Sequence, residues 1–179
     1  AETLREKYPD IPIIGMEPAL KPAALSMDHA QVLVMATALT LREDKFHQLL
    51  QTFENTADIY LLPAPGIVEF VEQGVTESPG LSAYLSELLA PYRRQRVDCI
   101  VLGCTHFPFV RESIHRALGY PVRFFEGGRG AARETRRRLQ AQCLCNPQAK
   151  PGTLNFETSC GASEKKRLCQ KLFGLYQPM

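Results

Sequence analysis

The chain has 179 residues and a net charge of +2, and 45% of its residues are hydrophobic and 22% charged. This length and composition allow a buried core in one large domain or in two small ones. No run of about 18 apolar residues occurs, which excludes a membrane span, and no signal-peptide pattern opens the chain, so we expect a cytoplasmic location.

The distribution of charges and cysteines narrows the kinds of partner. Residues 129–179 hold ten Lys or Arg against three Asp or Glu, so this part carries +7 and the rest of the chain −5. Basic residues on helices usually form a solvated face, and we therefore predict no nucleic-acid partner.

Six cysteines without a secretory signal are expected to be free thiols. The spacing of Cys143, Cys145, Cys160 and Cys169 does not fit a zinc site, so no metal is expected.

Hydrophobic patterning predicts strands and helices that alternate along the chain. The helical segments, in chain order, are 1–8, 22–29, 44–55, 67–73, 82–92, 109–118, 129–142 and 163–173. The short segments expected to be strands are 11–15, 31–36, 58–62, 97–102, 122–125 and 154–158. This alternation favours an α/β fold in which helices cover both faces of a parallel sheet.

Proline and glycine residues mark the points where the chain is expected to change direction. Pro18 and Pro22 indicate a crossing between two lobes. Gly127 and Gly128 indicate a hinge that leads back towards the first lobe. Residues 146–153 are polar and contain Pro and Gly, which is typical of a loop.

One stretch places three reactive side chains directly after a buried strand. The apolar run 99–102 is followed, after one glycine, by a thiol, a hydroxyl and an imidazole, which belong to Cys104, Thr105 and His106. A proline two residues later opens the next predicted helix. Ligands of open α/β sheets bind at the carboxyl ends of the strands, and the free N–H groups of a helix start can hold a carboxylate. This stretch is therefore the strongest candidate for a functional site.

These residue types can carry acid–base chemistry. Removal of the α-proton of an amino acid needs a positioned base, and a thiolate can serve as that base. His106 is expected on the same side of the turn as Cys104, where it can hold or relay a proton. Glu69 and Glu72 lie on one face of the helix at 67–73, and such a pair is more often solvated than functional.

The motif Gly-Cys-Thr-His-Phe-Pro at 103–108 closely resembles the second cysteine motif of the cofactor-independent glutamate racemases. Four further segments are similar to that family in the same order along the chain: 13–23, 32–40, 65–72 and 156–173. The resemblance implies a two-lobed α/β fold. It also implies that two cysteines racemise glutamate without a cofactor and supply D-glutamate for peptidoglycan synthesis.

The resemblance assigns roles to six side chains. Cys104 corresponds to the acid–base thiol, His106 to the imidazole that assists it, and Glu72 to the carboxylate that pairs with this imidazole. The hydroxyls implied in substrate binding are those of Thr37, Thr40 and Thr105. Judged from the sequence alone, threonines at a strand end such as Thr37 and Thr40 are commonly helix caps.

The family's first cysteine motif has no counterpart in this sequence. We therefore expect a fragment in which residues 1–20 are a remnant of the first lobe, 21–127 form the second lobe, and 128–179 return to the first. Such a chain is expected to be inactive alone and to self-associate, because part of a sheet that it packs on would be missing.

The resemblance implies a small-molecule substrate, glutamate, and a soluble enzyme without a membrane partner. Two alternatives remain open on the sequence. One is a non-catalytic module that binds an acidic amino acid or a regulatory partner, and the other is a relative of the aspartate racemases.

Overall fold

The computed structural model describes residues 1–148, 152–159 and 163–176, and the described residues form a four-stranded parallel sheet. The strands are β1 (Ala30–Ala36), β2 (Ala57–Pro63), β3 (Cys99–Leu102) and β4 (Arg123–Glu126), in the order β2-β1-β3-β4. Val32 to Met35 of β1 pair in register with the whole of β3, which makes these two the inner strands. The α/β fold class predicted from the sequence is confirmed.

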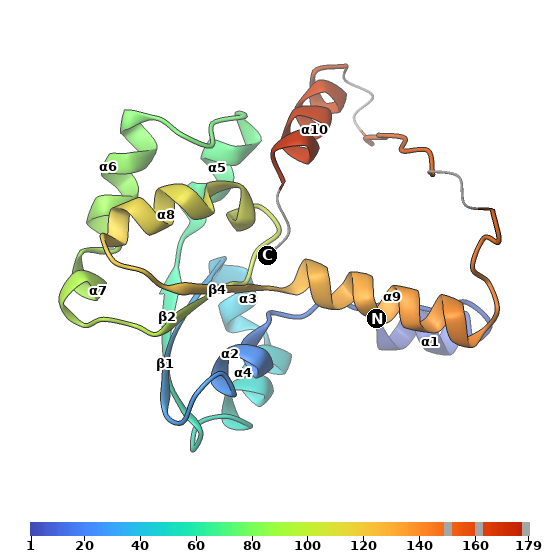
Figure 1. The fold of residues 1–179 in the computed structure, drawn as a ribbon, viewed down its shortest axis with the longest axis horizontal. Coiled ribbons are helices and arrows are strands. Elements are labelled where there is room, and N and C mark those ends of the chain that lie inside the picture. Colours follow the sequence, from blue (N-terminus) through green and yellow to red (C-terminus); the bar gives the residue numbers. More distant parts are fainter. Residues whose placement is uncertain (149–151, 160–162, 177–179) are drawn as a thin grey trace.

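Helices precede, connect and follow these strands (Figure 1). They are α1 (Glu2–Lys7), α2 (Leu20–Ala24), α3 (Ala38–Arg42), α4 (Asp44–Gln51), α5 (Pro65–Glu72), α6 (Pro79–Leu88), α7 (Ala90–Arg94), the 3-10 helix η1 (Phe107–Val110), α8 (Arg111–Leu118), α9 (Gly127–Ala141) and α10 (Ser163–Leu175). Local signals explain several ends. The Ser78 side chain caps α6, and Gly119, with a φ of 78°, ends α8 in the left-handed conformation that glycine tolerates.

The two faces of the sheet bury separate hydrophobic clusters. Leu33 and Met35 of β1 point to one face, where they pack in a cluster with residues of α5, α6 and α8. Val32 and Val34 point to the other, where they pack with residues of α2 and α4. All four are completely buried, because side chains of a strand alternate and both faces are covered. Helices therefore lie on both faces, as the alternating pattern predicts.

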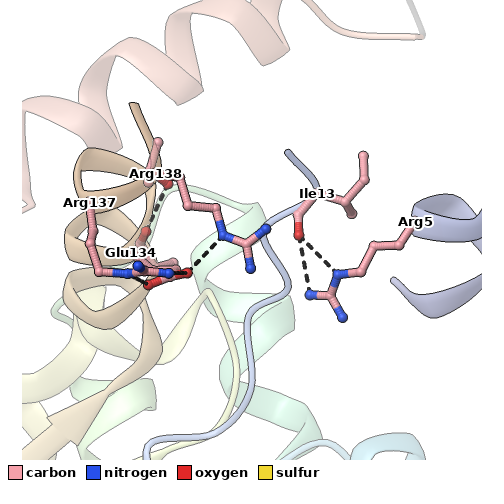
Figure 2. A network of polar contacts seen from close by, with 7 residues as sticks. Arg5, Ile13, Glu134, Arg137 and Arg138 are labelled. Atoms are coloured by element: carbon pink, nitrogen blue, oxygen red, sulfur yellow. Dashed lines mark hydrogen bonds and ion pairs between the residues drawn. The ribbon is translucent and has the colours of Figure 1, made fainter. Parts of the chain in front are cut away.

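Helix α9 extends away from the sheet and buries none of its residues (Figure 1). Figure 2 shows how its charges are arranged: Glu134 accepts hydrogen bonds from Arg137 and Arg138 of the same helix, at 2.7 and 2.8 Å. Both bonds lower the pKa of Glu134, to about 2, and the bond from Arg137 has the larger effect. In the same figure Arg5 of α1 donates to Ile13 O at 3.2 Å. The basic surface predicted at the start of the C-terminal part is thus a solvated helix face.

Two predicted strands are wrong. Residues 11–15 and 154–158 contain no strand, and Ile11 and Leu154 are each 55% exposed. An apolar run becomes a strand only when a neighbouring strand pairs with its N–H and C=O groups. Neither segment pairs with the sheet, and the carbonyl group of Ile13 accepts from the Arg5 guanidinium instead.

Smaller differences concern helices. The helix predicted at 82–92 is two helices, α6 and α7, and a short helix, α3, that is not among the predicted segments follows β1. Gly127 and Gly128, predicted to form a hinge, are the first residues of α9, with Glu126 accepting from the N–H groups of Gly128 and Arg129. Among the described residues, no helix combines the length and the apolar character needed to cross a lipid bilayer.

Candidate active site

The loop that carries Cys104 leaves the sheet at the carboxyl end of β3, one of its two inner strands. The Gly103 N–H donates to Met35 O at 2.8 Å, so the neighbouring strand β1 still holds the chain at this point. A Cβ on Gly103 would lie 3.1 Å from Met35 O and 3.1 Å from Ala36 Cβ, which only glycine avoids. Four residues after Gly103, the side chain of Phe107 is completely buried, and its N–H donates to Cys104 O at 3.2 Å. The reactive loop is therefore fixed at both ends.

Three predicted catalytic side chains lie in a connected row. Cys104 Sγ is 3.6 Å from His106 Nδ1, and His106 Nε2 is 2.8 Å from Glu72 Oε1. Glu72 is the last residue of α5, which packs against η1, the helix that follows His106. The structure thus brings together a thiol, an imidazole and a carboxylate that the sequence separates by up to 34 positions.

The carboxylate determines how the imidazole faces the thiol. Hydrogen bonds from Lys165 and from His106 lower the pKa of Glu72, so this group is ionised at neutral pH and can only accept. The hydrogen on His106 Nε2 must then be the one donated to Glu72. In a neutral imidazole this leaves the lone pair of Nδ1 directed at Cys104, where it can take the thiol proton.

The predicted substrate-binding hydroxyls do not have equivalent positions. Thr37 caps α3: its Oγ1 accepts from the Thr40 N–H at 3.2 Å and lies 3.0 Å from Thr40 Oγ1. Thr40 and Thr105 both line the cavity next to Cys104. The structure therefore gives Thr37 the capping role that the sequence left open, and places the other two hydroxyls where a ligand could reach them.

A cavity of about 840 Å³ lies over the carboxyl edge of the sheet. It is lined by residues 16–18, by residues of α3 and α5, by the Cys104 loop, by the end of β4 and the start of α9, and by α10. Those with reactive or charged side chains are Glu17, Glu43, Glu72, Cys104, His106, Glu126 and Cys169. The volume lies within the range typical of small-molecule sites, and its walls are mostly apolar with a few polar groups.

The residues that sequence reasoning missed belong mainly to α10. Lys165 forms an ion pair with Glu72, Cys169 lines the cavity, and the Tyr176 hydroxyl donates to Glu126 Oε1 at 2.9 Å. No local signal points to these contacts, because they join positions that are 50 or more residues apart.

The cysteines of the described residues are all free thiols: Cys99, Cys104, Cys143, Cys145 and Cys169. Burial raises the pKa of the Cys99 thiol, which lies in the core. Cys160 lies outside the described residues. Within the described part of the chain, no three His, Cys, Asp or Glu side chains are grouped as metal ligands would be.

Comparison with known proteins shows which family this chain resembles. A sequence model of the Asp/Glu/hydantoin racemases matches residues 1–135. The chain is 41% identical over 172 residues to a glutamate racemase of Clostridium perfringens and 38% identical over 175 residues to one of Clostridium novyi. These alignments cover 96% and 97% of this chain, but 66% and 68% of the relatives.

A solved structure shows the same likeness in three dimensions. The glutamate racemase of Escherichia coli, in complex with L-glutamate and the activator UDP-MurNAc-Ala, superposes with a TM-score of 0.76 and 32% identity. The superposition covers 96% of this chain and 65% of that one. The chain therefore spans about two thirds of the length of the proteins that it matches.

Proposed function

The chain belongs to the Asp/Glu/hydantoin racemase family, and we propose that it acts in the racemisation of glutamate with Cys104 as one of two acid–base thiols. The observation that carries this proposal is the row Cys104–His106–Glu72, which lines a cavity at the carboxyl edge of a parallel sheet. The choice of glutamate is supported by the names of the relatives and by the L-glutamate bound to the Escherichia coli protein.

In the proposed reaction Cys104, as a thiolate, removes the α-proton from one face of the amino acid. The C–H bond breaks, an S–H bond forms on Cys104, and the electron pair stays on the α-carbon. A second thiol then gives its proton to the opposite face, which inverts the centre. His106 takes the Cys104 proton through Nδ1, Glu72 keeps the ring in that orientation, and Thr40 and Thr105 bind the substrate carboxylate.

We further propose that residues 1–179 do not racemise glutamate alone. Cys169 lines the same cavity, but it lies on α10 rather than at a strand-to-helix turn like Cys104. In this proposal residues 21–127 form one lobe, residues 1–20 and 128–179 belong with another, and the product D-glutamate serves peptidoglycan synthesis. Exposed apolar side chains on α1 and α9, such as Leu4 and Leu139, favour self-association of the chain.

The test separates the half-reaction at Cys104 from complete racemisation. The purified chain is incubated with each enantiomer of glutamate in D₂O, and exchange of the α-proton is followed by NMR while polarimetry follows racemisation. We expect slow exchange of one enantiomer without net racemisation. Light scattering on the same sample reports the oligomeric state.

Matched cysteine variants assign the exchange. Cys104→Ser should reduce exchange by at least tenfold, because a hydroxyl is a far weaker acid than a thiol. Cys145→Ser, at an exposed position outside the cavity, should leave it unchanged. Racemisation by the unmodified chain would contradict its proposed inactivity, and its loss in Cys169→Ser would identify Cys169 as the second thiol. Binding of glutamate without exchange of either enantiomer would favour a binding module instead.

A further inference from the structure

Helix α10 adds a fourth side chain to the row of catalytic groups. Glu72 accepts from His106 Nε2 through Oε1 at 2.8 Å, and its other oxygen, Oε2, contacts the ammonium group of Lys165 in the first turn of α10. We propose that Lys165 is a positioning residue: it holds Glu72 in the orientation in which Glu72 fixes the His106 ring. This inference rests on the function proposed above for Cys104 and His106.

Lys165 does not reach the site as a loose surface side chain, because the C-terminal end of its helix contacts the rest of the fold. Lys171 Nζ donates to Gly74 O at 2.9 Å, just beyond the end of α5. Leu172 packs against the core cluster on this face of the sheet, and the Tyr176 hydroxyl donates to Glu126. An exposed ion pair usually contributes little, since ordering two long side chains costs entropy. Here the docked helix already restrains one of the two.

The expected effect of Lys165 follows from the orientation of the Glu72 carboxylate with and without the lysine. Lys165 is the largest cause of the lowered pKa of Glu72, followed by His106. An ionised Glu72 held by Lys165 presents Oε1 to His106 Nε2, which directs the Nδ1 lone pair at Cys104. Without the lysine, the carboxylate is free to rotate towards water, and the imidazole is no longer held to one tautomer.

The size of this effect is limited by solvent. The side chains of Lys165 and Glu72 are 44% and 47% exposed, so water screens the pair. Other titratable groups line the same cavity: Glu17, Glu43, Glu126, Cys169 and Tyr176. These groups are neutral or anionic at pH 7 and cannot replace an ammonium group. We therefore expect loss of Lys165 to slow the reaction of Cys104 with an alkylating reagent by about two- to fivefold at pH 7.

The experiment measures the site directly and does not depend on turnover. In the full 179-residue chain, the ¹³C shift of the Glu72 carboxyl carbon is followed from pH 2.5 to 7, with Glu72→Gln to assign the signal. Peptide mass spectrometry gives the rate at which iodoacetamide modifies Cys104 at pH 7. In Lys165→Met the Glu72 titration should move to higher pH, and the Cys104 rate should fall by the stated factor. Lys165→Arg keeps the positive charge and should restore both.

Two matched variants separate charge pairing from helix docking. Lys166→Met removes the neighbouring charge, which is exposed on α10, and should change neither quantity. Lys171→Met weakens the docking of α10 at Gly74 but retains the Lys165 ammonium group, so both quantities should change less than in Lys165→Met. If Lys165→Met leaves the Glu72 titration and the Cys104 rate unchanged, or if Lys171→Met changes them equally, the proposal is wrong. Absence of α-proton exchange from either enantiomer of glutamate would count against the proposed function and would leave both readouts intact.

Discussion

Substitution of Phe107 by alanine tests whether the buried ring fixes the reactive loop. Phe107 is completely buried and follows His106 directly, with its side chain in the hydrophobic cluster that includes Leu102 and Ile114. Removal of a fully buried phenylalanine ring typically costs about 3–5 kcal/mol, because the apolar contacts are lost and a cavity remains. A domain of this size is stable by about 5–15 kcal/mol, so we expect a large but measurable loss of stability.

The assay is urea denaturation followed by far-UV circular dichroism, with the loss read from the shift of the midpoint at an unchanged slope. Phe173→Ala is the matched control, because Phe173 is 58% exposed. Its ring packs edge-on against the ring of Phe156, and the two ring centroids are 5.8 Å apart. Such a pair contributes about 0.5–1.5 kcal/mol, so the control should lose no more than that. A Phe107→Ala protein destabilised by less than about 1 kcal/mol, or by no more than the control, would refute this account of the loop.

Two further predictions follow from the polar contacts. Glu72→Gln and His106→Asn should each slow alkylation of Cys104. The double variant should react no more slowly than the slower single variant, because either loss disables the same unit. Additive effects of the two substitutions would contradict a link between Glu72 and His106. The lowered pKa of Glu134, about 2 against a usual 4.5, means that its pairing stabilises α9 above pH 4.5 and is lost as the pH falls towards 2. The helical circular dichroism signal of the unmodified chain should therefore exceed that of Glu134→Gln at pH 7, and the difference should vanish near pH 2.

The part of the site that could be predicted from the sequence is the part that is local. The run 99–102 is apolar at every position, as a strand buried on both faces requires, and it forms β3 with all four residues buried. Cys104 and His106 follow within one turn, so their proximity depends on the backbone of a few residues. The pairing with Glu72 was implied only by family resemblance, since the periodicity of α5 places Glu69 and Glu72 on the same face.

The wrong strand predictions have a common physical cause. Residues 11–15 are largely apolar, and residues 154–158 alternate apolar and polar side chains as a strand does, but the N–H and C=O groups of a strand also need a partner strand. That partner is a property of the whole fold and cannot be predicted from the segment. Phe156 illustrates the alternative: it lies in a coil segment, lines the cavity and packs edge-on against Phe173 of α10.

The basic C-terminal part shows why the number of charges in a segment does not reveal which of them face solvent and which contact the site. On α9, Arg137 and Arg138 pair with Glu134 of the same helix and face solvent, as the count suggests. On α10, the same kind of residue serves other elements: Lys165 pairs with Glu72, 93 positions away, and Lys171 donates to the main chain beyond α5. Neither helix has a fully buried residue; the difference arises because α10 contacts the core cluster through the partly buried Leu172, whereas the charges of Arg137 and Arg138 are paired within α9 itself. Which charges reach a site therefore depends on which helix is docked, and it is this docking that brings a distant ammonium group to the carboxylate beside His106.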